Sequence, residues 1–173
     1  MSQNLLVIGE KAPDFCLVDL TGSTHCLTEF LGHVVMINFW SAECPVTAQV
    51  DQELIPQLKR WGEQVTALFL AVNANEPREM IERVAGERQV PLVLLDQDHR
   101  VADLYAAQTT PHFFVLDRDG RLRYQGGFND VTFRHRTATR QYLTEAVESV
   151  LLNLDPDPDV TQPYGCAIVR FSA

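Results

Sequence analysis

Residues 34–45 read VVMINFWSAECP, an apolar run followed by a short polar loop and a Cys-Pro pair. The run Val34–Trp40 is rich in β-branched and aromatic residues, which predicts a strand buried on both faces. After Pro45, which suits a first helical turn, apolar residues return at helical spacing. A buried strand therefore leads into a helix, and Cys44 stands at the junction.

Apolar runs and helical periods alternate along most of the chain. The expected strands are 15–18, 34–40, 67–72, 92–95, 112–117 and 122–126, and the expected helices are about 45–58, 77–88, 101–106 and 138–153. A turn at 21–23 predicts that the first strand belongs to an N-terminal β-hairpin. This order predicts an α/β fold with a central mixed β-sheet, parallel near its centre and flanked by helices.

Length and composition indicate one globular domain. The chain has 173 residues, of which 46% are hydrophobic and 21% charged, as in ordinary globular proteins. Its net charge of −9, from 23 acidic and 14 basic residues, repels phosphate backbones, so nucleic acid is not an expected partner. Prolines at 156, 158 and 163 prevent helix formation there. We therefore expect a domain at 1–153 and an extended tail at 154–173 that carries Cys166.

The location of the protein is predicted from its apolar segments. The longest apolar runs, 34–40 and 66–72, have seven residues each, whereas a membrane helix needs about 20. The first ten residues have neither the basic start nor the cleavage site of a secretory signal. We expect a cytoplasmic protein without a membrane partner, in which cysteine chemistry is reversible and disulfides are not permanent staples.

Cys44 is the candidate nucleophile. In α/β sheets, functional groups gather where strands end and helices begin. The amides of a first helical turn stabilise a thiolate and can lower the pKa of a cysteine from about 8.5 toward about 3.5 to 7.5. A cysteine can also be simply a small buried apolar side chain, so a structural role for Cys44 stays open.

The surroundings of Cys44 resemble the thioredoxin superfamily. Phe39-Trp40 precedes the cysteine, Pro45 follows it, and Thr110-Pro111 comes directly before a later strand. The spacing is most similar to the redoxin branch, which includes peroxiredoxins and TlpA-type thiol-disulfide oxidoreductases, over about residues 9–152. Residues 12–15 and 27–31 resemble the N-terminal hairpin of that branch.

The resemblance implies a thioredoxin-like fold and a redox-active cysteine that works without a cofactor. It implies an oxidoreductase, peroxiredoxin-like and antioxidant in activity. It also implies that Pro111 is a cis-proline packed against Cys44, and that the backbone of Thr110 pairs with a bound substrate chain.

Two positions depart from the family pattern. A dithiol oxidoreductase has Cys-x-x-Cys, but Thr47 stands where the second cysteine belongs. A peroxiredoxin has a proline where Ile37 stands and an arginine where the Thr110-Pro111 region lies, although Ser41 matches its hydroxyl. The site predicted here therefore contains a single cysteine.

A second thiol must complete the chemistry. Attack by a thiolate leaves a mixed disulfide or a sulfenic acid, and either needs another thiol for release. Cys166 is our first candidate, because Gly165 before it allows a close backbone approach. An external thiol is the alternative. Cys16 is expected to pack against the domain, and Cys26 is less suited because it lies near the hairpin turn.

Other side chains have expected supporting roles. The predicted substrate-binding or positioning residues are Trp40, Ser41, Pro45, Thr47, Thr110 and Pro111. Ser41 and Thr47 offer hydroxyl groups to a thiolate, although Thr47 can equally lack a role. Glu43 is expected to be a solvated loop acid.

The histidines and the clustered arginines suggest no further chemistry. The five histidines lack metal-ligand spacing, so no metal is expected. His112 follows Pro111 and falls near the site, although strand alternation can turn it away. The basic cluster 134–136 with Arg140 is expected to cap the last helix rather than to meet an acidic partner.

Three functions follow from these features. The first is a thiol-dependent oxidoreductase in which Cys44 attacks a protein or small-molecule disulfide or a peroxide, with a thioredoxin system or glutathione as reductant. The second is a weak thiol peroxidase that uses Cys44 and Ser41. The third is a non-catalytic binding or scaffold protein that keeps only the fold. The physiological substrate and the formation of a homo-oligomer are left open.

Overall fold

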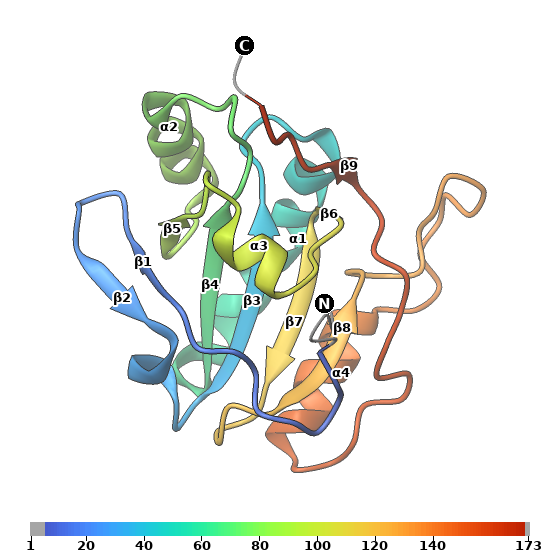
Figure 1. Ribbon diagram of the computed structural model, residues 1–173. Helices are drawn as coiled ribbons and strands as arrows, with labels where there is room; N and C mark the ends of the chain where they lie inside the picture. The colour runs from blue at the N-terminus through green and yellow to red at the C-terminus, as the bar shows by residue number, and fades with distance from the viewer. Residues whose placement is uncertain (1–5, 172–173) are drawn as a thin grey trace, which may run out of the picture.

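A five-stranded mixed sheet forms the centre of the computed structural model, which describes residues 6–171 (Figure 1). Its order is β5-β4-β3-β7-β8. The strands are β3 (Val34–Trp40), β4 (Val65–Ala71), β5 (Val93–Leu95), β7 (His112–Leu116) and β8 (Leu122–Gly126). β3, β4 and β5 run parallel, whereas β7 is antiparallel to β3 and to β8. The predicted thioredoxin-like α/β fold is confirmed.

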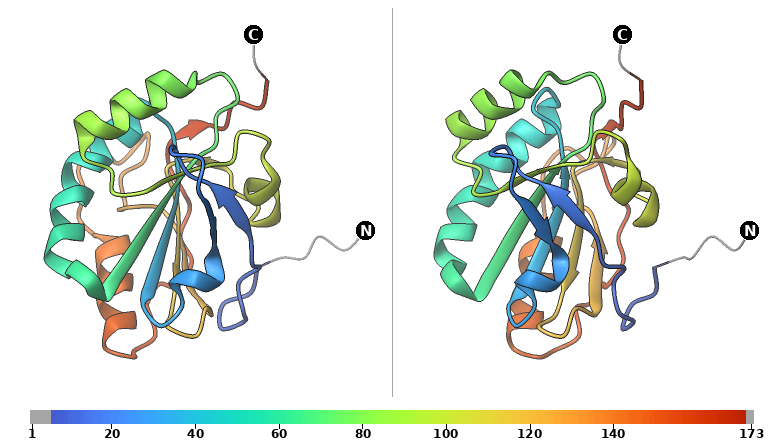
Figure 2. Two further views of the ribbon diagram at one scale, coloured as in Figure 1. Left: turned by 90° about the vertical axis from the view of Figure 1, so that its left-hand side faces the viewer. Right: turned by 60° about the vertical axis from the view of Figure 1, so that its left-hand side comes forward.

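Helices and a hairpin cover the two faces of the sheet. The helices are α1 (Pro45–Trp61), α2 (Arg78–Arg88), α3 (Arg100–Leu104), α4 (Tyr142–Leu151) and the short 3-10 helices η1 (Leu27–Phe30) and η2 (Gly62–Gln64). Figure 2 shows α1, α2 and α4 on one face, with the hairpin and α3 on the other. The last helix begins at Tyr142 rather than near 138, because Asp130 accepts hydrogen bonds from the amides of Thr139 and Arg140 and holds that segment as a loop.

The alternation of side chains along β3 explains its unbroken apolar sequence. Val34, Met36 and Trp40 face the core under α1 and α4. Val35, Ile37 and Phe39 face the core under the hairpin and α3. Every residue of β3 is buried, because successive side chains of a strand point to opposite faces and both faces here are covered.

The N-terminal hairpin consists of β1 (Cys16–Val18) and β2 (Thr24–Cys26). Cys16 lies directly opposite Cys26, and the two form a disulfide. The expectation that Cys16 packs against the domain is wrong, because its side chain is exposed. The neighbours Phe15 and Leu17 make the packing contacts instead, since alternation turns them toward the sheet.

The C-terminal tail runs over the surface and is bound along its length. The amide of Gln125, in β8, donates a hydrogen bond to the carbonyl of Asp159, and the amide of Thr161 donates one to the carbonyl of Gln125, each at 3.0 Å. Farther on, β9 (Cys166–Ala167) pairs antiparallel with β6 (Thr109–Thr110), near the top of Figure 1. The sequence did not predict these strands, because a two-residue strand is too short to show an alternation of apolar and polar side chains.

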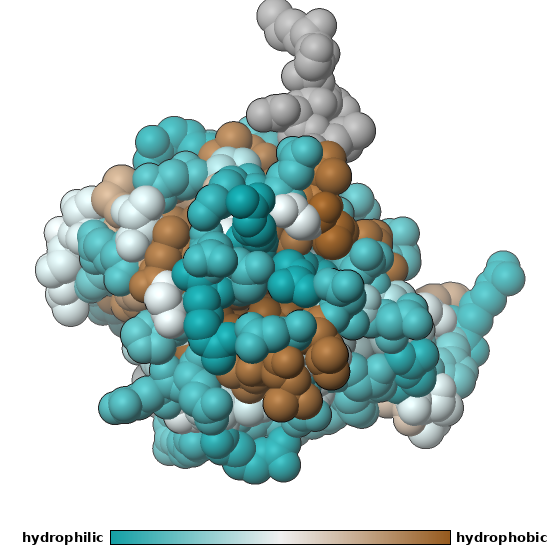
Figure 3. Space-filling view, turned by 90° about the horizontal axis from the view of Figure 1, so that it is seen from below, coloured by the Kyte–Doolittle hydropathy of each residue, from teal (hydrophilic) through white to brown (hydrophobic). Residues whose placement is uncertain are grey.

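The surface of the protein contains both hydrophilic and apolar areas. Within residues 6–171, no helix combines the length and the apolar composition needed to cross a bilayer. Viewed from below, at the end away from β9, the surface is mainly hydrophilic around apolar patches (Figure 3).

Stability should depend on pH through His112, a buried residue of β7. Burial lowers the pKa of His112 from 6.5 to about 4, so the folded chain resists a proton that the unfolded chain binds. The free energy of unfolding should therefore fall by about 3 kcal/mol as the pH decreases from 6.5 to 4. Urea unfolding across this range should show a smaller decrease for His112→Asn, whose side chain can still accept the bond from the Gln108 amide. The exposed control His33→Asn should keep the wild-type decrease; an equal decrease in all three proteins would contradict this assignment.

Candidate active site

Cys44 lies at the carboxyl end of β3 and forms the N-cap of α1. Its side chain is only 4% exposed. A disulfide joins it to Cys166, 122 residues later, across a Cα–Cα distance of 6.2 Å. That distance lies in the usual range for a disulfide, about 4.4 to 6.8 Å. The fold thus brings together the two cysteines that sequence reasoning put first.

The tail reaches Cys44 by pairing with the strand before Pro111. Cys166 lies opposite Thr110 in the β6–β9 pair, and the Thr110–Pro111 peptide is cis, as the family resemblance implied. The Cys44 sulfur lies 3.2 Å from the Thr110 carbonyl oxygen. A Cβ atom on Gly165 would lie 2.1 Å from that oxygen. Only glycine allows the tail to come this close.

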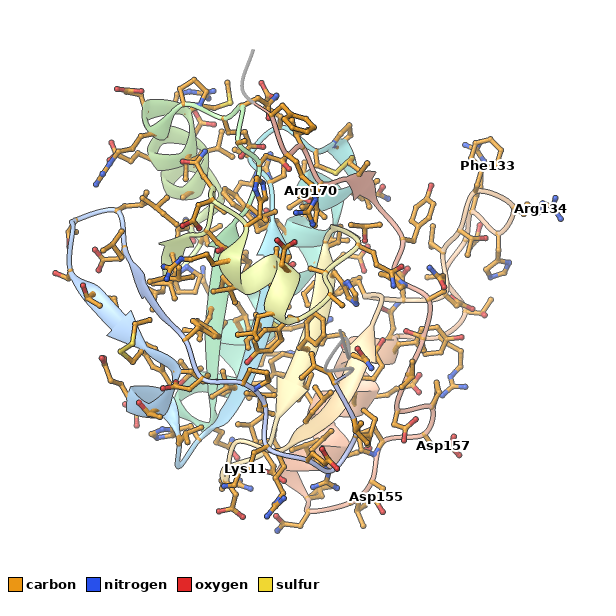
Figure 4. All side chains as sticks on the ribbon, viewed as in Figure 1. Lys11, Phe133, Arg134, Asp155, Asp157 and Arg170 are labelled. Carbon is orange, nitrogen blue, oxygen red and sulfur yellow. A yellow bond between two sulfur atoms is a disulfide. The ribbon has the colours of Figure 1, made fainter. Side chains whose placement is uncertain are left out.

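A second anchor holds the tail beyond Cys166. The amide of Ala74 donates to the carbonyl of Val169, and the amide of Val169 donates to the side-chain oxygen of Asn73, both at 2.9 Å. Arg170 adds an ion pair with Asp103 at 2.7 Å, near the top of Figure 4. The tail is therefore held on both sides of Cys166 by contacts that do not involve sulfur.

The loop before Cys44 is organised by a buried carboxylate, Glu76, which is 2% exposed. It accepts hydrogen bonds from the backbone amides of Ala42 at 3.0 Å and Glu43 at 3.2 Å, and from the hydroxyl of Ser41. The Ser41 oxygen in turn accepts a bond from the amide of Cys44 at 3.0 Å. Glu76 therefore sets the path of the chain into the N-cap of α1.

Asn73 connects this loop with the tail. Its side-chain amide donates to the Ser41 oxygen at 3.0 Å and to Glu76 at 3.2 Å, while its side-chain oxygen accepts from Val169. Sequence reasoning missed both Asn73 and Glu76. The signal was available, because these polar residues follow β4 at the same sheet edge where Cys44 follows β3.

The side chains of Ser41, Thr47 and Thr110 are fully buried. Ser41 and Thr47 are close to Cys44 in the chain, and Thr110 is close to it in space. Ser41 commits its hydroxyl hydrogen to Glu76, so the expected donation from Ser41 to a thiolate is not available in this arrangement. The hydroxyls of Thr47 and Thr110 have no hydrogen-bond partner within residues 6–171. These two hydroxyls, unlike that of Ser41, are not committed to another group.

Trp40 is a fully buried core residue and supports the loop before Cys44 from the inside of the protein. Its indole NH donates to Asp51 at 2.8 Å, and Arg88 donates to the same carboxylate at 3.0 Å. Burial raises the pKa of Asp51, while these two hydrogen bonds oppose that effect. Arg88 also donates to the Ala42 carbonyl at 2.8 Å, so the end of α2 supports the loop as well.

Three further residues that the sequence singled out are Glu43, Pro45 and His112. Glu43 and Pro45 are exposed beside Cys44, as expected for Glu43. His112 is buried, accepts a hydrogen bond from the Gln108 amide and stacks against Phe114. Strand alternation has thus turned it away from the sulfur.

The expectation for the basic cluster holds only for Arg140, which forms an ion pair with Glu145 in the first turn of α4. Residues 133–136 instead lie on a loop that projects from the body, as Figure 4 shows for Phe133 and Arg134. The guanidinium of Arg136 covers the ring of Phe133 at 5.5 Å.

A small cavity of about 180 Å³ lies between α1 and the loop that follows β8. Its lining includes Val46, two residues after Cys44, and Tyr164, two residues before Cys166. Phe128 and Val131 add apolar surface, and Arg136 contributes a positive charge. Within the described residues, no group of three or more potential metal-ligating side chains occurs.

Together, the fold and the site define a redoxin, an oxidoreductase built on the thioredoxin fold. A family model described as the AhpC/TSA family matches residues 8–125, and the chain belongs to this family. Cys44 lies inside the matched region and Cys166 outside it.

The chain is also similar to a named relative and to two solved structures. The thiol-disulfide oxidoreductase ResA of Geobacillus thermodenitrificans is 31% identical over 122 residues, which cover 68% of each chain. A hypothetical protein from Sinorhizobium meliloti is 27% identical with a TM-score of 0.85, covering 98% of this chain and 97% of that one. An uncharacterized conserved protein from Geobacillus kaustophilus is 26% identical with a TM-score of 0.83, covering 96% and 93%.

Replacing Glu76 should destabilise the protein through the loop. In Glu76→Gln, an amide group replaces one carboxylate oxygen and leaves at least one buried donor unsatisfied, which should lower the free energy of unfolding by about 2 kcal/mol. Urea unfolding measures the loss. The matched control is Glu79→Gln on the exposed side of α2, which should change stability by less than about 0.5 kcal/mol. Equal effects of the two substitutions would show that the loop does not depend on the Glu76 carboxylate.

Replacing Gly165 should impair closure of the Cys44–Cys166 bridge. The methyl group of Gly165→Ala would collide with the Thr110 carbonyl, so the tail should dock poorly and the bridge should form at least about tenfold more slowly, which corresponds to about 1.4 kcal/mol. Loss of free thiols after addition of an oxidant to the reduced protein measures the rate. Gly86→Ala is the control, because a methyl group there meets no atom within 4 Å. Wild-type rates in both variants would rule out the close approach as a requirement.

Proposed function

We propose that this protein is a thiol-disulfide oxidoreductase in which Cys44 attacks a substrate disulfide and Cys166 resolves the product. The observation that gives this proposal the most support is the set of backbone contacts that binds the tail beside Cys44. Backbone pairing at Thr110 and the Val169 anchor hold Cys166 beside Cys44 without help from the disulfide itself. Reduction of the bridge should therefore leave the second thiol close to the first.

The first half of the cycle takes place at Cys44. Its thiolate attacks one sulfur of the substrate disulfide, a new S–S bond forms at Cys44, and the other substrate sulfur leaves as a thiolate. The N-cap position of Cys44 favours the thiolate, because the N-terminus of a helix carries a partial positive charge. The free hydroxyl of Thr47, in the same turn, is our candidate for an added hydrogen bond to that charge.

The second half takes place between the two cysteines. The thiolate of Cys166 attacks the Cys44 sulfur, the second substrate sulfur leaves as a thiolate, and the Cys44–Cys166 bridge forms. The substrate has then gained two electrons and the enzyme has lost two. Two external thiols restore the dithiol form. Cys166, which is more exposed than Cys44, is the sulfur we expect the first external thiol to attack.

The surroundings of the sulfur favour a disulfide over a peroxide as substrate. Peroxide reduction leaves an alkoxide or hydroxide, which a hydrogen-bond donor must stabilise. Next to the Cys44 sulfur lies the carbonyl oxygen of Thr110, an acceptor, and the Ser41 hydroxyl is committed to Glu76, which leaves the hydroxyls of Thr47 and Thr110 as the candidate donors. A weak thiol peroxidase is therefore the second candidate. Glutathione or a thioredoxin system in the cytoplasm is the reductant we propose for either reaction.

Substitution of each cysteine separates the two roles. Cys44→Ser should abolish reduction of a disulfide substrate, because the attacking sulfur is lost. Cys166→Ser should keep the first step and accumulate a mixed disulfide on Cys44, since no resolving thiol is present. Intact mass and peptide mapping after one equivalent of a disulfide substrate, and separately of hydrogen peroxide, detect these species.

The double variant Cys16→Ser/Cys26→Ser is the control and should keep wild-type turnover. Full activity of Cys44→Ser would refute the mechanism, and an unmodified Cys44 would instead support the non-catalytic scaffold. Resolution by Cys16, Cys26 or an external thiol would appear as unchanged turnover in Cys166→Ser. Hydrogen peroxide consumption that exceeds disulfide reduction would favour the peroxidase.

A further inference from the structure

We propose that Cys16 and Cys26 form a second thiol-disulfide exchange site, which reacts with a low-molecular-weight thiol and works independently of Cys44 and Cys166. The hairpin that carries this pair and the β9 strand that carries Cys166 lie far apart in Figure 1. The proposal does not rest on the function proposed above.

The hairpin ladder determines the geometry of this pair. Phe15 pairs with Leu27 through the bond from the Leu27 amide to the Phe15 carbonyl at 2.9 Å, and Cys16 with Cys26 is the next pair along. Because hydrogen-bonded and non-hydrogen-bonded pairs alternate in an antiparallel ladder, Cys16 and Cys26 form a non-hydrogen-bonded pair, in which Cα atoms come closest.

The resulting distance is shorter than disulfides prefer. The Cα atoms of Cys16 and Cys26 are 4.0 Å apart, compared with 6.2 Å for Cys44 and Cys166. Relaxed bridges span about 4.4 to 6.8 Å, and departures from that range make a bridge easier to reduce. The Cα atoms of the hairpin cysteines are therefore closer together than a relaxed bridge favours.

The hairpin is held by other contacts, so opening the bridge need not unfold it. Asp19 accepts hydrogen bonds from the amides of Thr21 at 2.8 Å and Ser23 at 3.0 Å, which close the turn. At the other end, Phe15, Leu17 and Leu27 are buried in the core under the hairpin. A pair that can open inside a persistent scaffold is suited to repeated exchange.

An attacking thiol has access to Cys16. The side chain of Cys16 is exposed, whereas that of Cys26 is partly buried. A hollow of about 390 Å³ lies beside Cys16, between the hairpin and the segment after β5, and Thr24, Gln97 and Arg100 contribute polar groups to its lining. Sites for small molecules are typically about 300 to 1,000 Å³, so this hollow is large enough to admit a small thiol to Cys16.

The exchange is a two-electron reaction. The thiolate of the small molecule attacks the Cys16 sulfur, the Cys16–Cys26 bond breaks, and Cys26 leaves as a thiolate that takes up a proton. A second molecule of the small thiol then attacks the small-molecule sulfur of the mixed disulfide. This step releases Cys16 as a thiol and yields the small-molecule disulfide. The hairpin gains two electrons and two small thiols lose them.

The test uses the full chain with Cys44→Ser and Cys166→Ser, so that only the hairpin pair can react. Glutathione is the probe. In millimolar reduced glutathione, alkylation and peptide mapping should show the bridge open in at least half of the molecules, with mixed disulfide on Cys16 rather than Cys26. The circular dichroism spectrum should stay that of the oxidised protein. The complementary variant, Cys16→Ser/Cys26→Ser, reports the Cys44–Cys166 bridge under the same conditions, which should open less readily.

Either of two results would overturn the proposal. A bridge that resists glutathione until a denaturant is added would be a structural staple. Adducts found on Cys26 alone would contradict the accessible attack at Cys16. Neither result affects the chemistry of Cys44, since the double variant lacks that cysteine.

Discussion

The structure around Cys44 depends on one buried carboxylate. Glu76 gathers two backbone amides, the Ser41 hydroxyl and the Asn73 amide into a single set of hydrogen bonds. A buried carboxylate is costly unless its oxygens are fully hydrogen-bonded, so the loop and Glu76 constrain each other. That mutual constraint delivers Cys44 to the start of α1, where the helix amides can stabilise a thiolate.

The same network extends to the tail. Asn73 holds the Ser41–Glu76 pair with its amide nitrogen and the Val169 backbone with its oxygen, so one side chain links the loop before Cys44 to the chain after Cys166. Backbone pairing at Thr110 and the absence of a side chain at Gly165 complete the seat. The tail thus places Cys166 beside Cys44, whereas Thr47 stands where a dithiol oxidoreductase has its local second cysteine.

The two disulfides differ because different forces set their distances. Tail docking places the Cα atoms of Cys44 and Cys166 6.2 Å apart, which suits a bridge, whereas those of Cys16 and Cys26 lie 4.0 Å apart as directly opposed residues of a hairpin ladder. Local hydrophobic pattern predicted the sheet, the hairpin and the place of Cys44 between β3 and α1 well. It predicted Cys16 wrongly, because one exposed residue in a three-residue strand carries too little pattern to show its direction.

The sequence by itself determined the strand-to-helix junction at Cys44, the mixed sheet and the extended tail, because these follow from local hydrophobic period, proline geometry and short-range spacing. Only the tertiary structure decided that Glu76 and Asn73 form the base of the site, that Ser41 is committed to Glu76, and that the tail is seated on β6. Those contacts join residues far apart in the chain, and a buried hydrogen bond between distant side chains leaves no periodic signal in either segment.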